Sequence, residues 1–129
     1  MTNQEIRQFL QEAIDENRVM LFMKGTPEQP ACGFSARTAG ALNTLGVEYS
    51  ALDILPDPRI RQELSAISGW PTIPQLFIGG ELVGGCDIVV EMFESGELAD
   101  ALGSSGQPEA VPDSRATEPP PLQIDNLQR

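Results

Sequence analysis

The stretch from Val19 to Ser35 limits the folds open to this chain more than any other part of the sequence. It begins with five apolar residues, Val19-Met20-Leu21-Phe22-Met23, a length typical of a strand that is buried on both faces. A loop rich in glycine and proline follows, and a helix is predicted to begin within or just after Cys32-Gly33-Phe34-Ser35. A strand that ends in such a loop before a helix brings a loop side chain to the mouth of a sheet. The stretch therefore predicts an α/β fold with a cysteine at that edge.

Cys32 is predicted to lie at a helix N-terminus, where unpaired N–H groups and the helix dipole favour an anion. Such a position lowers the pKa of a cysteine and increases the fraction of thiolate, the form that attacks disulfides and binds metals. The residues from Cys32 read C-G-F-S, whereas a dithiol redox site reads C-x-x-C. Ser35 cannot act as a resolving thiol, so a reactive Cys32 needs a partner from outside the chain. The alternative is a buried, inert cysteine.

The other elements follow from apolar periodicity and from start and stop signals. Thr2 and Glu5 resemble a capping box ahead of an amphipathic helix, and Asp57-Pro58 resembles the start of another helix, which Gly69 ends. Gly79-Gly80 predicts a tight turn between two strands, and Asp87 is predicted to cap the next helix. The predicted helices are 2–14, 34–45, 57–67 and 87–93 with a final turn at 98–102, and the predicted strands are 19–23, 47–54, 75–78 and 81–83.

This order, α-β-α-β-α-β-β-α(α), predicts a four-stranded mixed sheet flanked by helices on both faces. It matches the thioredoxin fold with an extra N-terminal helix. Residues 1–102 are expected to form this single domain. Residues 103–129 contain five of the chain's eleven prolines and few apolar side chains, which predicts a disordered Pro/Ser/Gly-rich tail. Its segment 122–127 is interpreted as solvated, with docking to a partner or to the protein itself as the alternative.

The formal net charge of −11 argues against binding to nucleic acid and to anionic membrane surfaces. No stretch is long and apolar enough to span a membrane, and the N-terminus does not resemble a signal peptide. Two cysteines are too few for a disulfide framework, so we expect a soluble, cytoplasmic protein in a reducing setting. The chain's only lysine, Lys24, lies in the cysteine loop, where it either binds a small anion or is simply solvated.

Two further stretches are candidates for ligand binding. Trp70-Pro71-Thr72-Ile73-Pro74 precedes the predicted hairpin, which places Pro74 opposite the cysteine loop in a thioredoxin-like sheet. A cis Ile73–Pro74 bond would offer the backbone of Ile73 to a peptide-like ligand, whereas an ordinary trans proline is the alternative. Gly84-Gly85-Cys86-Asp87 leads into a helix N-terminus, which is either a second anion site or only a tight turn.

Together, the motifs K-G-T-P-E-Q-P-A-C-G-F-S, W-P-T-I-P-Q-L-F-I-G-G-E-L and V-G-G-C-D-I resemble the monothiol glutaredoxins with a C-G-F-S active site. The resemblance covers about residues 1–102 and implies a glutathione site. It implies that Cys32 is the nucleophile or cluster ligand, and that Lys24 and Arg61 face the glycine carboxylate of glutathione, with Arg59 a weaker candidate. The remaining implied contacts are Phe34 along the groove, the Ile73 backbone beside the cysteinyl part, and Cys86 and Asp87 at the γ-glutamyl end.

The same resemblance implies a role in iron–sulfur cluster transfer or assembly and in iron homeostasis. A homodimer would hold one labile [2Fe-2S] cluster through Cys32 and one glutathione thiolate from each side, with BolA-like proteins and Fe–S apoproteins as partners. The alternative is a glutathione-dependent oxidoreductase that removes glutathione from mixed disulfides by a monothiol route, expected to be a weak enzyme at most. A third hypothesis treats Cys32 and Cys86 as a redox-sensing pair.

Overall fold

The computed structural model describes residues 1–104, which divide into two compact units at Gly96. Helix α5 (Glu97–Ser104) belongs to the second unit and extends two residues past the predicted domain end at residue 102. The remainder of the predicted tail, residues 105–129, lies outside the described residues. No helix in the described part of the chain is long and apolar enough to cross a membrane.

The first half of the first unit follows the predicted order. Helix α1 (Asn3–Glu16) has the expected capping box, in which the Thr2 hydroxyl accepts from the Glu5 N–H at 3.1 Å. Strand β1 (Val19–Met23) is buried at every position, as its continuous apolar run predicted. Helix α2 (Gly33–Leu45) ends at Gly46, whose φ of 71° is the left-handed conformation that glycine adopts most readily.

Strand β2 (Ser50–Asp53) is shorter than the predicted strand 47–54. It lies at the edge of the sheet and pairs only with β1, in parallel, with Met20 opposite Ser50 and Met23 opposite Asp53. In this register Tyr49 would lie opposite Val19, the first residue of β1, so residues 47 and 48 lie beyond the start of the neighbouring strand. The alternating pattern of residues 47–49 could not reveal this limit, since it depends on the partner's length.

The second half contains helix α3 (Pro58–Ser68), strands β3 (Gln75–Ile78) and β4 (Glu81–Gly84), and helix α4 (Cys86–Ser95). Asp57 caps α3 by accepting from the Arg59 N–H at 3.0 Å, as predicted. The prediction that Asp87 caps α4 is wrong, because the N-cap residue is Gly85 and Asp87 lies in the first turn. The hairpin closes two residues earlier than a cap at Asp87 would require, so Cys86 is already helical.

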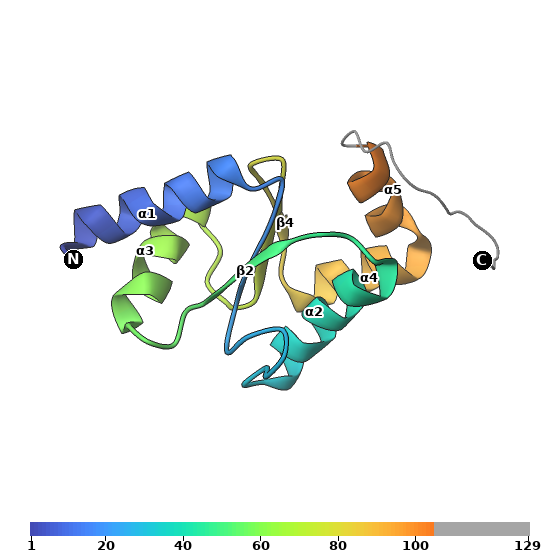
Figure 1. The fold of residues 1–129 in the computed structure, drawn as a ribbon, viewed down its shortest axis with the longest axis horizontal. Coiled ribbons are helices and arrows are strands. Elements are labelled where there is room, and N and C mark those ends of the chain that lie inside the picture. The colour runs from blue at the N-terminus through green and yellow to red at the C-terminus, as the bar shows by residue number, and fades with distance from the viewer. Residues whose placement is uncertain (105–129) are drawn as a thin grey trace. The chain divides into compact units, whose positions relative to one another are not determined.

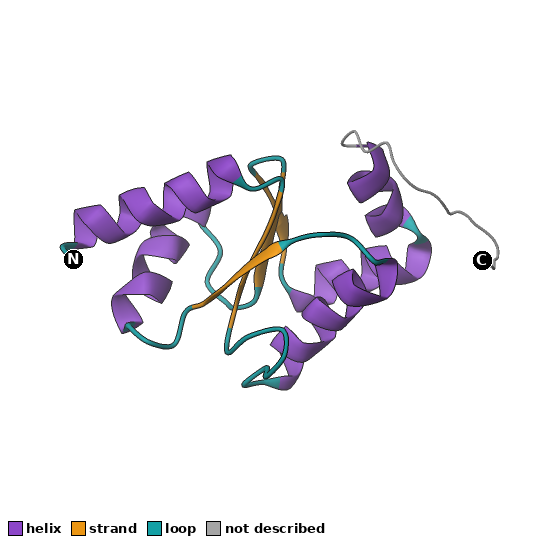
Figure 2. Cartoon of the chain, in the orientation of Figure 1, coloured by secondary structure: helices purple, strands orange, loops and turns teal. Residues whose placement is uncertain are grey.

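The sheet has the strand order β2-β1-β3-β4, with β1 antiparallel to β3 and β3 antiparallel to β4. Helices α1 and α3 pack together on one face and α2 and α4 on the other (Figures 1 and 2). Under α1 and α3, the rings of Phe22 and Phe77 meet edge to face at 5.7 Å between centroids. The expected mixed sheet with helices on both faces is therefore confirmed. The ends of β1 and β4 and the start of β3 lie at the same edge of the sheet, where the chain continues toward α2 and α4.

Candidate functional site

Cys32 is the N-cap residue of helix α2, and its thiol is partly exposed. Its Sγ accepts a hydrogen bond from the backbone N–H of Ser35 at 3.4 Å, which is the position of a capping side chain. The Sγ and the Oγ of Ser35 are also 3.4 Å apart and within hydrogen-bond reach. The sulfur thus occupies the end of the helix where negative charge is favoured.

The pKa of the Cys32 thiol lies below its ordinary value, as predicted. Desolvation by burial raises this pKa, but the hydrogen bonds from the Ser35 side chain and backbone, the Phe34 backbone and the charge of Lys24 together lower it by more. Cys32 is therefore richer in thiolate than an isolated cysteine at the same pH. The thiol is also only partly buried, unlike the fully buried side chain of the alternative.

The loop between β1 and Cys32 is fixed by its own hydrogen bonds and by two outside acceptors. The Oγ of Ser35 accepts from the Lys24 N–H at 3.0 Å, and the Oδ1 of Asp53 accepts from the Gly25 N–H at 2.9 Å. Within the loop, the Ala31 N–H donates to the Lys24 carbonyl at 2.9 Å. Lys24 is therefore held beside the start of α2 by backbone contacts, which leave its ammonium group free to bind an anion.

Six of the seven predicted site residues line one hollow of about 370 Å³. The predicted residues among its lining are Lys24, Phe34, Arg61, Ile73, Cys86 and Asp87. Cys32 is not part of the lining, although it lies two residues before Phe34 at the same helix start. Residues that are up to 63 positions apart in the sequence thus meet in one place, with cations on α3 and the cysteine loop and a carboxylate on α4.

The two arginines of α3 have different environments. Arg61 lines the hollow and donates from Nη2 to the Pro71 carbonyl at 2.9 Å, which leaves other N–H groups of its guanidinium for a ligand. Arg59 instead pairs with Asp57 at 2.9 Å and donates to the Met1 carbonyl at 2.7 Å. The preference for Arg61 over Arg59 agrees with this geometry.

The opposite wall of the hollow is the start of α4. Its N-cap residue, Gly85, makes no side-chain capping bond, so the N–H groups of the first turn have no side-chain acceptor there. Cys86 is 7% exposed, and Asp87 is in the first helical turn. The Ile73–Pro74 peptide bond is cis, as the site hypothesis required.

Sequence reasoning overlooked several residues at this site. Trp70, Thr72 and Ile88 also line the hollow, and the first two belong to a motif that was already singled out. Ser35, Asp53 and Gln75 act from behind it through hydrogen bonds. The sequence indicates only that Ser35 cannot act as a resolving thiol. Neither Asp53 nor Gln75 has a local pattern that reveals its hydrogen-bond partner.

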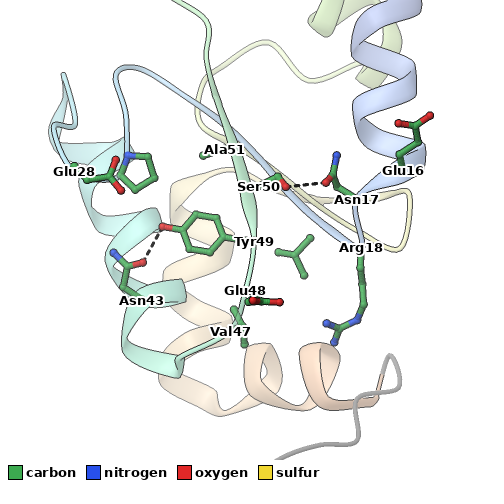
Figure 3. A pocket seen from close by; sticks show the side chains of 12 residues that line it. Glu16, Asn17, Arg18, Glu28, Asn43, Val47, Glu48, Tyr49, Ser50 and Ala51 are labelled. Atoms are coloured by element: carbon green, nitrogen blue, oxygen red, sulfur yellow. Dashed lines mark hydrogen bonds between the residues drawn. The ribbon is translucent and has the colours of Figure 1, made fainter.

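A larger hollow of about 910 Å³ borders the edge strand β2 (Figure 3). Tyr49 points toward α2, where its hydroxyl donates to Asn43 at 2.8 Å, and Ser50 points toward Asn17, to which its hydroxyl donates at 2.7 Å. Desolvation and the charge of Glu28 raise the pKa of Tyr49. None of the predicted site residues and neither cysteine lines this hollow, so the smaller hollow is the candidate site despite its size.

Within residues 1–104, no three histidine, cysteine, aspartate or glutamate side chains are grouped so as to hold a metal ion. Both cysteines are free thiols. Cys32 is the more accessible of the two, because Cys86 is buried. The described part of one chain thus presents a single accessible soft ligand at the site.

Comparison with known proteins gives consistent matches. The family model described as glutaredoxin matches residues 19–83. The probable monothiol glutaredoxin 2 of Rickettsia typhi is 54% identical over 102 residues, which cover 79% of this chain and 91% of that protein. The match to the family model contains the candidate residues Lys24, Cys32, Phe34, Arg61 and Ile73 and ends before Cys86 and Asp87.

Two solved structures are similar to this chain over about four fifths of its length. The solution structure of reduced poplar apo GrxS14 has a TM-score of 0.71 and 40% identity, and the match covers 81% of this chain and 97% of that one. The crystal structure of a buckwheat glutaredoxin–glutathione complex has a TM-score of 0.70 and 28% identity, with 79% and 91% covered. These likenesses confirm the thioredoxin fold that the element order predicted.

Proposed function

Since this chain belongs to the glutaredoxin family, among its monothiol members, we propose that it binds glutathione and carries a labile [2Fe-2S] cluster between two subunits. The cluster is its cargo, for transfer to Fe–S apoproteins and for iron homeostasis, with a BolA-like protein as a partner. We place this activity in a reducing compartment that contains glutathione, such as the cytoplasm. The observation that carries the proposal is the convergence of six predicted site residues in one hollow.

The chemistry of the hollow suits glutathione. Glutathione is a tripeptide with a carboxylate at its glycine end and a carboxylate and an ammonium group at its γ-glutamyl end. Lys24 and Arg61 provide positive charge for the glycine carboxylate. At the other end, the uncapped N–H groups of α4 suit the γ-glutamyl carboxylate, and Asp87 suits the ammonium group. Ile73 also lines the hollow, and its backbone can pair with the cysteinyl part.

The number of thiols supports a shared cluster. A [2Fe-2S] cluster needs four thiolate ligands, and Cys32 is the one accessible thiol at the described site. Two chains therefore supply two ligands, and two bound glutathione molecules supply the other two. A cluster held partly by exchangeable ligands is suited to release. The low pKa of Cys32 favours ligation, because the thiolate is the form that binds metal.

The second candidate is removal of glutathione from mixed disulfides, and the low pKa of Cys32 favours it. The Cys32 thiolate would attack the glutathione sulfur, form a Cys32–glutathione disulfide and release the protein thiolate, which takes up a proton. The thiolate of a second glutathione would then attack the glutathione sulfur of that disulfide. This step would release oxidised glutathione and restore the Cys32 thiolate. No second cysteine is needed, so Cys86 has no part in this route.

Anaerobic cluster reconstitution with and without glutathione tests the proposal, with visible absorption and size-exclusion chromatography as readouts. We expect a coloured dimer that forms only when glutathione is present. A colourless monomer that still reduces glutathione mixed disulfides would refute the carrier proposal and favour the second candidate. A coloured dimer that forms without glutathione would contradict the ligand count.

A further inference from the structure

Gln75 is a fully buried polar residue directly behind the candidate site. It is the first residue of β3, follows Pro74, and is 0% exposed. Burying an amide is costly unless its polar atoms are hydrogen-bonded. Its Nε2 donates to the Trp70 carbonyl at 3.0 Å and to the Thr72 carbonyl at 3.1 Å. Both amide hydrogens are therefore directed at one short segment of the chain.

That segment, Trp70 to Pro74, forms one wall of the hollow. Trp70, Thr72, Ile73 and Pro74 all line it, although they lie between α3 and β3 and belong to neither element. A loop without regular structure has no helix or ladder bonds to fix its carbonyl groups. Gln75 supplies that fixation from inside the protein, on the side away from the ligand space.

The same loop also contacts the opposite wall. A Cβ atom placed on Gly85 would lie 3.1 Å from the Nε1 of Trp70 and 3.3 Å from the Pro74 carbonyl oxygen. The indole and this carbonyl therefore pack closely against the Gly85 backbone, at the N-cap of α4. A shift of Trp70 would change the spacing between the loop and the start of α4, where Cys86 and Asp87 lie.

The other end of the Gln75 amide argues for the same role. Its Oε1 is buried and has no hydrogen-bond partner among the described residues, which costs about 1–3 kcal/mol. A leucine of similar size would avoid this cost and fill the same space. The role that accounts for an amide at this position is therefore the placement of the carbonyls of Trp70 and Thr72, not the stabilisation of the core.

We propose that Gln75 is a positioning residue for glutathione. By holding the carbonyls of Trp70 and Thr72, it sets the loop wall of the hollow and, through the contact between Trp70 and Gly85, the distance to the start of α4. This inference rests on the proposed function, because it presumes that the hollow binds glutathione. Gln75 acts through the loop and does not itself line the hollow.

The test compares Gln75→Leu with the wild-type protein, using calorimetry of glutathione binding and the fluorescence of Trp70. Trp70 is the only tryptophan of the chain, so its emission reports directly on the loop. We expect the variant to bind glutathione about tenfold more weakly, a change of about 1.4 kcal/mol, and to show a shifted Trp70 emission maximum. Should Gln75→Leu fail to fold, Gln75→Met removes the same donors with a more adaptable side chain.

Leu10→Ala is the control for a loss of stability alone. Leu10 is fully buried in α1 and belongs to the core beneath α1 and α3. We expect this variant to unfold at a lower temperature while its glutathione affinity and Trp70 emission stay at wild-type values. Equal weakening of glutathione binding in Leu10→Ala and Gln75→Leu would assign Gln75 an ordinary structural role.

Two other outcomes separate this inference from the proposed function. If the wild type binds glutathione and Gln75→Leu binds it equally well with unchanged Trp70 emission, only the positioning role is refuted. If the wild-type protein does not bind glutathione at all, the proposed function fails and this inference fails with it.

Discussion

The Oγ of Ser35 accepts a hydrogen bond from the backbone N–H of Lys24 at 3.0 Å, so a helix residue holds the loop that precedes the reactive cysteine. Ser35 is 0% exposed, and its Oγ also lies 3.4 Å from the Cys32 sulfur. Because the backbone N–H of Lys24 binds a lone pair of this oxygen, the hydroxyl hydrogen is free to donate to the Cys32 thiolate. One hydroxyl group thus links the positions of the cation and the sulfur.

Ser35→Ala is expected to raise the pKa of Cys32. The variant loses the side-chain hydrogen bond that favours the thiolate, while the bond from the backbone N–H of residue 35 remains. A hydrogen bond to a charged group is worth about 1.5–3 kcal/mol, so an upward shift of about one pH unit is reasonable. The rate of Cys32 alkylation against pH, measured in a Cys86→Ser background, gives the pKa directly.

Ser65→Ala is the matched control for this experiment. It also removes a serine hydroxyl, but that hydroxyl is on α3 and has no hydrogen-bond partner among the described residues. Its alkylation profile is expected to overlay the wild-type profile, with a midpoint below the ordinary pKa of a cysteine. A Ser35→Ala profile that also overlays the wild type would show that the hydroxyl does not set the pKa.

The two cysteines are expected to differ in cluster binding. Cys32→Ser should abolish the visible absorption of the reconstituted cluster, because it removes the accessible thiolate at the site. Cys86→Ser should largely retain it, since Cys86 is only 7% exposed. Absorption spectra after anaerobic reconstitution compare the variants at equal protein concentration. Equal loss in both would contradict Cys32 as the sole protein ligand.

Lys24→Ala is expected to weaken glutathione binding, by about fivefold to tenfold at low ionic strength. Lys24 is partly exposed, so the attraction of its ammonium group for the glycine carboxylate should be screened by salt. Calorimetry at two salt concentrations measures both effects. We expect the affinities of variant and wild type to converge at high salt. Unchanged affinity at low salt would show that Lys24 is simply solvated and does not bind the carboxylate.

Arg61→Ala and Arg59→Ala form a second pair, two residues apart on the same helix. Arg61 lines the hollow, whereas Arg59 is engaged with Asp57 and the Met1 carbonyl. We expect Arg61→Ala to weaken glutathione binding by about tenfold and Arg59→Ala to leave it unchanged. A competition assay for glutathione binding at fixed ionic strength compares the affinities of the two variants. A comparable loss in Arg59→Ala would indicate a nonspecific effect of net charge.

The residues that line the candidate site were easier to predict from the sequence than those that hold them in place. Lys24 and Asp87 lie in short motifs, and the strand-loop-helix order predicts that these motifs approach one another. Arg61 lies outside the motifs and was implied by the family resemblance alone. Gln75 and Asp53 could not be found in this way. Asp53 accepts from Gly25, which is 28 positions away in the sequence. The partners of Gln75, Trp70 and Thr72, are near in sequence, but their carbonyls face the amide only because of the folded path of a loop without regular structure.

Differences in the fold have a similar origin. The N-cap of α4 was misassigned to Asp87 because aspartate is a common cap, whereas the hairpin geometry brings Gly85 to that position. Helix α2 buries the polar side chains of Ser35 and Thr38, while Ala36 is exposed, so apolar spacing alone does not identify its inner face. In each case a tertiary contact overrode a local preference.

Gly25→Ala tests how strongly the conformation of the cysteine loop supports binding. Gly25 has a φ of 86°, and a Cβ there would lie 2.5 Å from the Gln29 carbonyl oxygen and 2.6 Å from the Ala31 nitrogen. Gly79→Ala is the matched control, since Gly79 has a φ of 60° but nothing within 4 Å of its Cβ position. Both variants incur the cost of a positive φ, about 1–2 kcal/mol, and only Gly25→Ala adds a backbone clash of about 1–3 kcal/mol. Denaturant unfolding should therefore rank Gly25→Ala as the less stable variant.

Glutathione binding should also separate the two variants. Because Lys24 precedes Gly25, only Gly25→Ala should bind glutathione more weakly than the wild type. Equal affinities in the two variants would show that the shape of the cysteine loop does not matter for the ligand.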